Sequence, residues 1–576
     1  MVLIFKIAII LLFLVPASLL AVDVEFRVSN PFSSSINNVL CEKNQKTSSI
    51  EVVAAVGEIE SASFTICNFS SEVKKISYSG IDVSSGSEKM LSAINIRYVK
   101  RWHQAGGAWT EHWRRKKDSK LVPELLVNDP YLVKVEGEDN YLKVNNEYIK
   151  ISDREIQSGM VIPEAKDFLV QDADTLVSIN LPSNKNQQYW LTIDSAGMPP
   201  GEYSAQIQLD VNNDKLLVPL ILKILPFELK ETKLIHSIYY RGVLRPGGEG
   251  SISSEYKSPE QLTAEFTNLK SHGIKNPTVY QPLKSKKKWA KYSQRQLDKS
   301  LKKYLKIRSV SGFNDKDLFF LGTTTGRSSS AKSLASVVYS YKKIQKIADD
   351  YGYSQVYIYG SDEAKKDKLT SQKQVWDTVR AAGGKVFVAG SKGHVDLMGA
   401  RTDLLVHRDE LSNREFDIMH KNKNRVFKYH DPKSGPENPM LFRYKRGLFL
   451  WQSGFDGAMD YAYQHSMGFI WNDFDNKRYR DLAFTYPTSN GVIDTIAWEG
   501  YREGIDDLNY LATLEYFIEQ VEKNTTVPDS VTALPKQYIL ELKNAGQVDL
   551  DNYRDVVTNH IKSLLQWLNP IVNKAA

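Results

Sequence analysis

The sequence lacks the short motifs that hold metals and nucleotides. Only two cysteines, Cys41 and Cys67, occur among 576 residues, and no Cys/His spacing typical of a zinc site is present. There is no phosphate-binding loop, no dinucleotide-binding glycine fingerprint and no nucleophile elbow. Basic and aromatic residues do not alternate as they do in nucleic-acid binders. We therefore expect no metal, no cofactor and no nucleic-acid partner.

Long apolar runs are also scarce, and the one that stands out is residues 1–21. It contains one lysine, an apolar centre and small residues near its end, which is the pattern of a secretory signal peptide. No cysteine lies near the expected cleavage point, and no later run approaches about 20 apolar residues. We expect an exported protein, periplasmic or extracellular, with no integral membrane segment after cleavage. In an oxidising compartment Cys41 and Cys67 can form one disulfide, and two buried thiols are the alternative.

The formal charge of +7 is unevenly distributed along the chain. Much of the lysine lies in residues 284–308, KSKKKWAKYSQRQLDKSLKKYLKIR. A solvated helix face with a basic loop is the favoured reading, and an anionic polymer or a membrane surface as partner is the alternative. Aromatic residues make up 11% of the chain, which suits a core and also suits stacking on sugar rings.

The chain divides into an all-β region and a region of alternating strands and helices. Residues 22–228 contain short alternating runs separated by turn clusters, which predicts an N-terminal β-sandwich region. From 229 to 520, eight apolar strand candidates alternate with helical segments, which predicts a (β/α)8 TIM-like barrel. The helix from 258 to 273 has a plausible capping residue in Ser258. Residues 521–576 are expected to form a C-terminal helical tail. The eight strand candidates are 235–242, 276–282, 317–326, 354–364, 385–394, 403–410, 425–432 and 457–464.

Two adjacent acids follow the fourth of these strands. The buried run that ends at Tyr359 is followed by Asp362 and Glu363, at the end of the strand where barrel enzymes carry their active sites. Adjacent residues of an extended segment point to opposite sides, so the pair does not suit a nucleophile and an acid facing each other. It suits substrate assistance, in which one carboxylate orients a 2-acetamido group and the other protonates the leaving oxygen. Closeness raises the pKa of one of the two carboxyls. The alternative is an acidic surface loop.

Three longer segments resemble one known family. Residues 486–515, YPTSNGVIDTIAWEGYREGIDDLNYLATLE, closely resemble the C-terminal motif of glycoside hydrolase family 123 and of related proteins that share its C-terminal domain of unknown function. Residues 198–211, MPPGEYSAQIQLDV, resemble a strand of that family, and residues 443–463 resemble the segment that leads into its last barrel strand.

The resemblance implies a fold and an activity. That family combines an N-terminal β-sandwich with a (β/α)8-like barrel, and its characterised members are β-N-acetylgalactosaminidases. Carried over to this chain, it makes Asp362 the acetamido-orienting residue and Glu363 the general acid/base. Two positions depart from the family pattern: Ala364 stands where a proline is expected, and Ala497 stands where an arginine usually precedes Trp498.

Six further residues are candidates for substrate binding, each with a structural alternative. Aromatic residues near the last strand could form the floor under a sugar ring, or they could be core residues. A tyrosine just after the seventh strand could donate a hydrogen bond to the acetamide, or it could belong to a structural loop. A cation and a histidine that end the first and fifth strands could contact substrate hydroxyls or acid groups, or form structural ion pairs. The six are Trp451, Tyr461, Trp471, Tyr429, Arg241 and His394.

Two other segments are notable. The acids of residues 502–507 are assigned to helix capping and salt bridging because they begin a helix rather than end a strand. Residues 101–117, with three tryptophans and two histidines, either reach over the barrel mouth or form a crossover anchored by their tryptophans.

Three functions remain in view. The first is a glycoside hydrolase that cleaves β-linked N-acetylhexosaminides, N-acetylgalactosamine preferred, by a retaining, substrate-assisted mechanism. The second is a glycosidase of the same fold acting on another sugar or on an anionic polysaccharide. The third is a non-catalytic glycan-binding surface protein. In each case the expected partner is an oligo- or polysaccharide, and the sequence does not indicate an oligomeric state.

Overall fold

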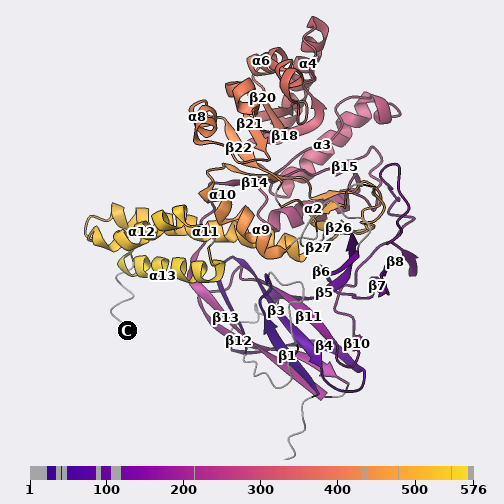
Figure 1. Ribbon diagram of the computed structural model, residues 1–576, viewed down its shortest axis with the longest axis vertical. Coiled ribbons are helices and arrows are strands. Elements are labelled where there is room, and N and C mark those ends of the chain that lie inside the picture. Colours follow the sequence, from indigo (N-terminus) through magenta and orange to yellow (C-terminus); the bar gives the residue numbers. More distant parts are fainter. Residues whose placement is uncertain are drawn as a thin grey trace, which may run out of the picture.

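The computed structural model describes residues 23–33, 41, 49–85, 92–105, 119–212, 214–430, 432–435, 438–477, 479–546 and 548–568. The expected signal peptide lies outside the described residues, as does most of the tryptophan-rich segment, at 106–118. None of the described helices combines the length and the apolar character that crossing a membrane requires. Figure 1 shows a strand-rich part at the bottom, a mixed part above it and long C-terminal helices to the left.

The strand-rich part contains two five-stranded sheets, with the orders β1-β3-β11-β5-β6 and β10-β4-β12-β13-β2. In β12, alternate residues from Tyr203 to Val211 are buried and those between them are more exposed, as the sequence alternation predicts. One apolar cluster contains side chains of both sheets, such as Tyr189 and Ile207. The strands are β1 (Val24–Ser29), β2 (Ile50–Val56), β3 (Ile59–Asn68), β4 (Lys74–Ser85), β5 (Ile94–Ala105), β6 (Ser119–Val127), β10 (Ile179–Leu181), β11 (Asn186–Asp194), β12 (Gly201–Val211) and β13 (Asp214–Glu228), with a small separate sheet of β7 (Val133–Glu136), β8 (Asp139–Val144) and β9 (Glu147–Lys150).

Cys41 and Cys67 form a disulfide, which resolves the alternatives that the sequence left open. The bond joins the segment before β2 to β3 across 26 residues. Closing a loop of this length removes entropy from the unfolded chain worth about 3 kcal/mol. We expect the Cys41→Ser/Cys67→Ser protein to lose about that much free energy of unfolding in urea denaturation. Equal stability of the two proteins under oxidising conditions would contradict this expectation.

The mixed part is built on eight parallel strands in one curled sheet, in the order β17-β14-β23-β22-β21-β20-β19-β18. Each of the eight segments expected from the sequence contains one of them. Strands such as β20 are buried on both faces, as is usual when helices cover a parallel sheet. The strands are β14 (Ile235–Ile238), β17 (Asn276–Pro277), β18 (Asp317–Thr324), β19 (Gln355–Tyr359), β20 (Lys385–Gly390), β21 (Leu404–His407), β22 (Arg425–Lys428) and β23 (Gly457–Asp460).

The two outer strands of this sheet approach each other. An isolated bridge joins Val279, just after β17, to Phe320 of β18. Two backbone hydrogen bonds support it, from Val279 N to Phe319 O at 2.9 Å and from Leu321 N to Val279 O at 2.7 Å. A Cβ at Gly322 would lie 1.8 Å from the carbonyl oxygen of Gln281, so only glycine permits this approach. An isolated bridge therefore links the outer strands of the curled sheet.

Helices follow most of these strands. Ser258 caps α2 in a capping box with Gln261, as the sequence predicts. Helix α4 begins at Ala331, after the capping residue Ser330, and ends at Asp349. The helices here are α2 (Pro259–Ser271), α3 (Gln294–Val310), α4 (Ala331–Asp349), α5 (Lys366–Thr370), α6 (Lys373–Ala381), α7 (His394–Met398), α8 (Asn413–Lys421), α9 (Pro439–Arg446) and α10 (Leu448–Gln452), with short 3-10 turns η1 (Lys287–Trp289) and η2 (Gly399–Arg401).

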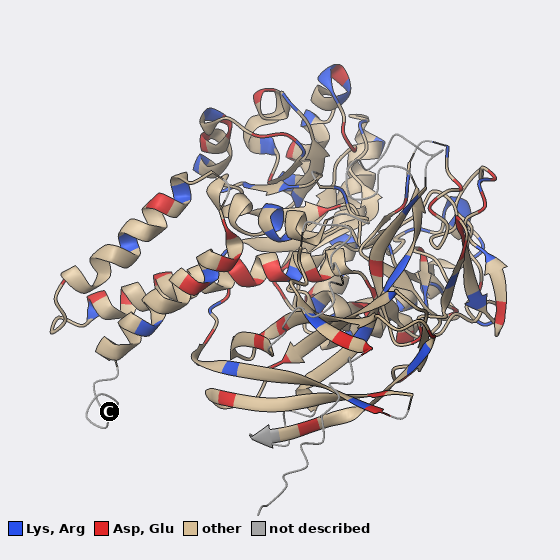
Figure 2. Cartoon of the chain, turned by 60° about the horizontal axis from the view of Figure 1, so that its bottom comes forward, with Lys and Arg blue, Asp and Glu red and all other residues tan. Residues whose placement is uncertain are grey.

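The chain ends in three helices, α11 (Ile496–Lys523), α12 (Ser530–Asn544) and α13 (Leu550–Leu568). The acids of residues 502–507 lie inside α11, which begins at Ile496 and is capped by Thr495. Glu503 and Asp507 form salt bridges, as expected. The acids do not cap the helix, because it starts earlier than the sequence indicated. Figure 2 shows acidic and basic segments interleaved over the chain. Short strand pairs β15 (Val243–Leu244) with β16 (Tyr256–Lys257), β24 (Gln464–His465) with β25 (Leu482–Ala483), and β26 (Thr485–Pro487) with β27 (Val492–Asp494) complete the fold.

Candidate active site

The turn after β19 places the two acids. A Cβ at Gly360 would lie 2.9 Å from the Trp376 ring and 3.0 Å from Val388, so glycine lets the chain leave the sheet between them. Glu363 adopts a φ of +44°, which is uncommon for a residue with a side chain. Its backbone N–H donates to the carbonyl of Ala389 at 3.1 Å. Backbone strain of this kind is concentrated at functional sites.

Asp362 accepts a hydrogen bond from a chain of tyrosines. The hydroxyl of Tyr359 donates to Asp362 Oδ1 at 2.6 Å. The hydroxyl of Tyr239, at the end of β14, lies 3.2 Å from that of Tyr359. Because a phenol has one hydrogen and that of Tyr359 goes to Asp362, Tyr239 is the donor in this second contact. The chain fixes one oxygen of Asp362 in place.

The carboxyl of Asp362 has a raised pKa. Burial is the main cause, and the neighbouring charge of Glu363 adds to it, while the hydrogen bond from Tyr359 opposes it. The sequence led us to expect a raised pKa that keeps a proton on the acid of the pair, whereas in the structure the raised pKa belongs to Asp362, the residue expected to orient the acetamido group. Its ionised form is therefore lost at a higher pH than for an ordinary aspartate.

Glu363 accepts a hydrogen bond from a residue at the end of another strand of the same sheet. Tyr429 follows β22, and its hydroxyl donates to Glu363 Oε1 at 2.5 Å. Burial is the main cause of the raised pKa of Tyr429, and the hydrogen bond to Glu363 adds to it, so the phenol stays protonated as the donor. Tyr429, expected from the sequence to face the substrate, is thus engaged with Glu363.

Arg241 and Tyr461 form a second polar group. The guanidinium of Arg241 donates to the Tyr461 hydroxyl at 2.9 Å and pairs with Glu255. It also lies over the ring of Tyr280, 5.4 Å from its centroid. Burial opposes the charged form, but Tyr461 and Glu255 together raise the pKa of Arg241. The arginine is therefore a fixed cation whose charge is already balanced by a carboxylate.

These groups share one pocket with a volume of about 480 Å³, within the size range of small-ligand sites. Its wall combines two carboxylates, the paired guanidinium of Arg241, the ammonium group of Lys433 and several tyrosine rings, which together can bind a ring with one apolar face and several hydroxyls. It is lined by Tyr239, Arg241, Tyr280, Leu321, Thr324, Tyr359, Asp362, Glu363, Ala389, Tyr429, His430, Lys433, Tyr461 and Leu482.

Three of the candidates from the sequence do not line this pocket. His394 is 2% exposed, contacts Thr402 Oγ1 at 2.9 Å, and has its pKa lowered to about 3 by burial. Trp451 lies on α10, with Lys543 Nζ 4.4 Å from its ring centroid. Trp471 is buried and donates from Nε1 to Pro487 O at 3.0 Å. His394 and Trp471 pack against neighbouring elements, and Trp451 lines a separate cavity of about 670 Å³.

Several residues that line the pocket were not expected from the sequence. Tyr239, Tyr280 and Tyr359 end strands in the same way as Arg241 and Asp362 do, and this position was the available signal. Nothing in the sequence marked Lys433. Burial and the charges of Arg408 and Arg480 lower the pKa of its ammonium group, and Glu363 opposes this.

A second group of ionisable residues lies away from the pocket. His272, Asp494 and Glu499 place possible metal-ligating atoms within 4.8 Å of one another. Arg97 pairs with Asp494 at 2.8 Å, and Arg502 pairs with Glu499 at 2.6 Å. Because two arginines already balance the carboxylates, we assign this group to packing between α11 and the strand-rich part.

Comparisons with known proteins give a likeness in fold. No protein-family model matches the chain, and no curated protein matches its sequence. A family 123 glycoside hydrolase from Clostridium perfringens, described in connection with glycolipid glycan hydrolysis, is 12% identical with a TM-score of 0.58, covering 96% of this chain and 99% of that one. A β-glucuronidase from Parabacteroides merdae is 7% identical with a TM-score of 0.30, covering 77% and 66%. An endo-β-1,4-mannanase from Thermotoga petrophila is 12% identical with a TM-score of 0.30, covering 49% and 77%.

Proposed function

We propose that the protein is a glycoside hydrolase that cleaves β-linked N-acetylhexosaminides, N-acetylgalactosamine preferred, by a retaining, substrate-assisted mechanism. The observation that carries the proposal is the pair Asp362 and Glu363, held separately by Tyr359 and Tyr429 in one pocket. The full-length likeness in fold to a family 123 glycoside hydrolase supports it.

Asp362 orients the acetamido group in this mechanism. Its carboxylate accepts the amide N–H of the sugar, so the amide oxygen can attack the anomeric carbon and the positive charge that develops is stabilised. Tyr359 holds one carboxylate oxygen from the protein side. Asp362 must be ionised for this role.

Glu363 serves as the general acid and then as the general base. As the acid it protonates the leaving oxygen, and as the base it activates the water that opens the cyclised intermediate. The bond from Tyr429 fixes the direction of this carboxyl. The tyrosine rings of the pocket offer apolar faces on which the sugar can stack.

The same proposal covers architecture and location. We assign the curled parallel sheet to a (β/α)8 TIM-like barrel, since the Val279–Phe320 bridge joins its outer strands, and the two five-stranded sheets to a β-sandwich. We assign the protein to the periplasm or the extracellular space. The apolar run at residues 1–21 and the disulfide between Cys41 and Cys67 support export.

A panel of aryl β-glycosides tests the mechanism. With N-acetylgalactosamine, N-acetylglucosamine, galactose and glucose as the sugars, we expect turnover only of the acetamido sugars. Asp362→Asn should lower that turnover by roughly 10²- to 10³-fold, the size of effect of losing one transition-state hydrogen bond. Because its pKa is raised, the Asp362 carboxylate becomes protonated at a higher pH than an ordinary aspartate does. As the pH is lowered, wild-type activity should therefore begin to fall at a pH above the usual pKa of aspartate. Turnover of galactosides or glucosides by an active Asp362→Asn enzyme would refute the mechanism.

A further inference from the structure

We propose that the glycan substrate is anionic, and that a second cavity beside the pocket binds its sulfate or carboxylate group on a sugar next to the one that is cleaved. This inference rests on the proposed function, because it names the class of glycan that the same site would take. It is carried by the position of the second cavity and by the charges that line it.

The second cavity adjoins the active-site pocket. Thr324, at the end of β18, lines both of them. The second cavity has a volume of about 320 Å³, at the small end of ligand sites, which suits one sugar residue. It lies between the end of β18 and the first turns of α4, where Ser333 and Ser336 offer hydroxyls. A glycan seated in the pocket can therefore extend past Thr324 into it.

The charges of this cavity are all positive. Lys284, Arg327 and Lys332 line it, and no carboxylate does. In the described part of the chain none of the three cations has an ion-pair partner; Lys284 donates a hydrogen bond to Ser336 Oγ at 3.2 Å. Partial burial and the nearby charges of Lys286 and Lys343 lower the pKa of Lys284, which agrees with a net positive field. An anion with hydroxyl-bearing neighbours is the ligand that fits such a lining.

The active-site pocket, in contrast, is lined by charged residues of both signs. Its arginine, Arg241, is paired with Glu255, and its two acids face the site where the bond is cleaved. An anion there would lie against Asp362 and Glu363 as well as Lys433, whereas the charged residues that line the second cavity are all cations. The charge pattern thus separates the place for the neutral acetamido sugar from the place for an acidic neighbour.

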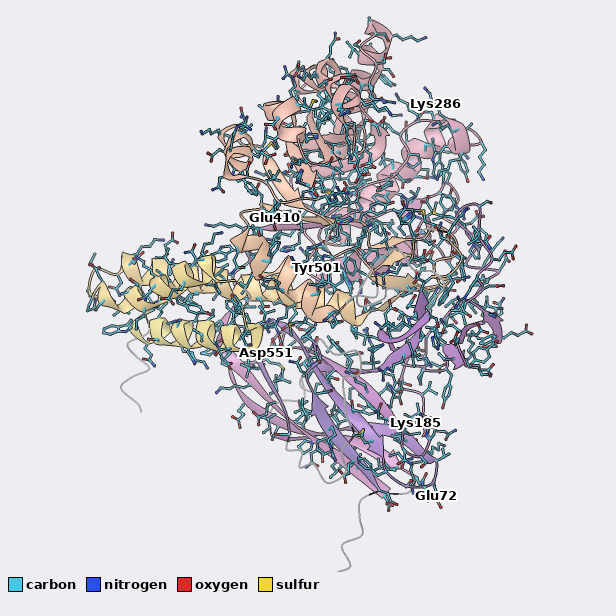
Figure 3. The ribbon with its side chains drawn as sticks, in the orientation of Figure 1. Glu72, Lys185, Lys286, Glu410, Tyr501 and Asp551 are labelled. Carbon is cyan, nitrogen blue, oxygen red and sulfur yellow. A yellow bond between two sulfur atoms is a disulfide. The ribbon has the colours of Figure 1, made fainter. Side chains whose placement is uncertain are left out.

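The lysine-rich segment 284–308 begins at this cavity. Lys284 is its first residue, and the exposed lysines of α3, including Lys299 and Lys303, continue from it. Figure 3 labels Lys286 at the upper right, beside α3. A chain with repeated anionic groups can follow these lysines away from the site, an interaction that weakens with salt. The sequence favoured a solvated helix face with a basic loop, whereas the position of the segment beside this cavity favours an anionic partner.

Binding measurements on uncleaved oligosaccharides test the inference. The Glu363→Gln protein is titrated calorimetrically with a sulfated chondroitin tetrasaccharide, an unsulfated chondroitin tetrasaccharide and neutral chitotetraose. We expect at least one of the two acidic ligands to bind about tenfold or more tightly than the neutral one, because charge-assisted hydrogen bonds are stronger than those between neutral groups. Preference for the sulfated ligand over the unsulfated one identifies sulfate; equal affinity for these two identifies the carboxylate.

Two double variants locate the effect. Arg327→Ala/Lys332→Ala should lower the affinity for the acidic ligands about 10- to 100-fold and leave that for chitotetraose nearly unchanged. Lys185→Ala/Lys215→Ala removes the same charge from two exposed positions of the strand-rich part and should change the acidic affinity by less than about threefold. Equal affinity for all three ligands, or equal losses in the two double variants, would overturn the inference. Neither result depends on turnover, so a failure of the proposed hydrolysis in the aryl panel is distinguished from a failure here.

Discussion

Replacing Glu363 by glutamine is expected to lower kcat by about 10²- to 10⁴-fold on an acetamido glycoside with a poor leaving group. Glutamine still accepts the hydrogen bond that Tyr429 donates, so the geometry of the site is retained. It cannot protonate the leaving oxygen, and that step then limits the rate.

Comparing substrates with good and poor leaving groups tests the acid role of Glu363 most directly. A dinitrophenyl glycoside needs little protonation, so the loss in Glu363→Gln should be much smaller with it than with an unactivated phenyl glycoside. Glu410→Gln is the matched control, because Glu410 is an exposed acid near the end of β21 that does not line the pocket. Its kinetics should equal those of the wild type. A loss of the same size on both substrates in Glu363→Gln would rule out the acid role and point to a structural one.

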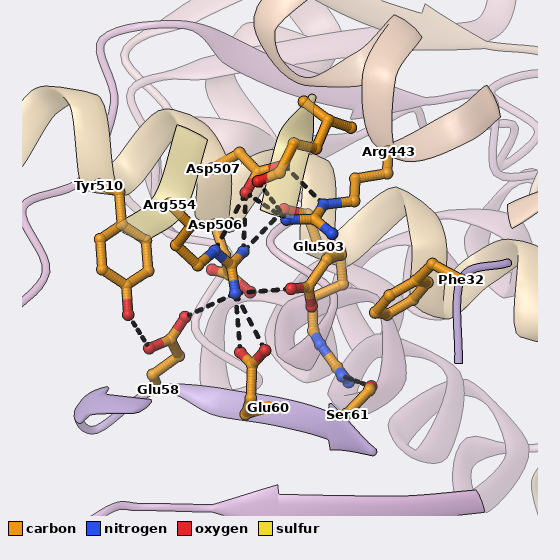
Figure 4. A network of polar contacts seen from close by, with 12 residues as sticks. Phe32, Glu58, Glu60, Ser61, Arg443, Glu503, Asp506, Asp507, Tyr510 and Arg554 are labelled. Carbon is orange, nitrogen blue, oxygen red and sulfur yellow. Dashed lines mark hydrogen bonds and ion pairs between the residues drawn. The ribbon is translucent and has the colours of Figure 1, made fainter. Parts of the chain in front are cut away.

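Replacing Arg554 by leucine is expected to lower the free energy of unfolding at neutral pH by about 3–5 kcal/mol. Arg554, on α13, contacts Glu503 at 2.6 Å, Asp507 at 2.9 Å and Glu60 at 3.0 Å. Figure 4 shows these carboxylates gathered around its guanidinium, with Glu58 beside them. Without the arginine these buried carboxylates lose a shared counter-charge.

The loss should shrink as the pH falls. Burial raises the pKa of Glu58 and Glu60 above the ordinary 4.5, so the folded chain binds more protons than the unfolded chain just above that value. The free energy of unfolding that these two protonated carboxyls contribute is therefore present at low pH and is lost as the pH rises through their raised pKa values. Removing Arg554 raises the pKa values of Glu58 and Glu60 further. The loss of unfolding free energy in Arg554→Leu, measured by urea denaturation, should therefore be smaller at pH 5 than at pH 7.5. A deficit independent of pH would show that lost packing, and not charge, is the cause.

A surface ion pair provides the control for Arg554. Lys523 pairs with Glu519 one turn earlier in α11 at 3.5 Å, and both side chains are largely exposed. Such pairs contribute about 0.5 kcal/mol or less. Lys523→Leu should therefore change stability little at either pH. The contrast shows that the network at Arg554 joins the strand-rich part to the C-terminal helices through buried charge.

Local sequence patterns predicted much of the architecture. Alternation of buried and exposed residues marked β12, and short apolar runs ending in glycine or polar residues marked all eight parallel strands. These signals are local because strand periodicity and turn chemistry act over a few residues. The same reasoning located Asp362 and Glu363 at the end of the fourth of them, and the pocket contains both.

The residues that surround the pair could not be assigned in the same way. Trp451 and Trp471 are aromatic residues of the type that stacks on sugar rings. Trp451 lies on α10 and Trp471 packs beside the strand-rich part, so neither lines the active-site pocket. Lys433 and Tyr280 line the pocket although they lie far apart in the chain. Their roles depend on which loops meet, and contacts over long sequence separations leave no short-range pattern.

The sequence by itself determined the strand order along the chain, the helix start at Ser258 and the acidic pair after β19, because each follows from side chains a few residues apart. Only the tertiary structure decided that Tyr359 holds Asp362 while Tyr429 holds Glu363, and that a cationic cavity opens beside them at Thr324. The physical reason is that curling the sheet brings the ends of separate strands together. Burial and charge at those ends, which raise the pKa of Asp362, exist only in the folded chain.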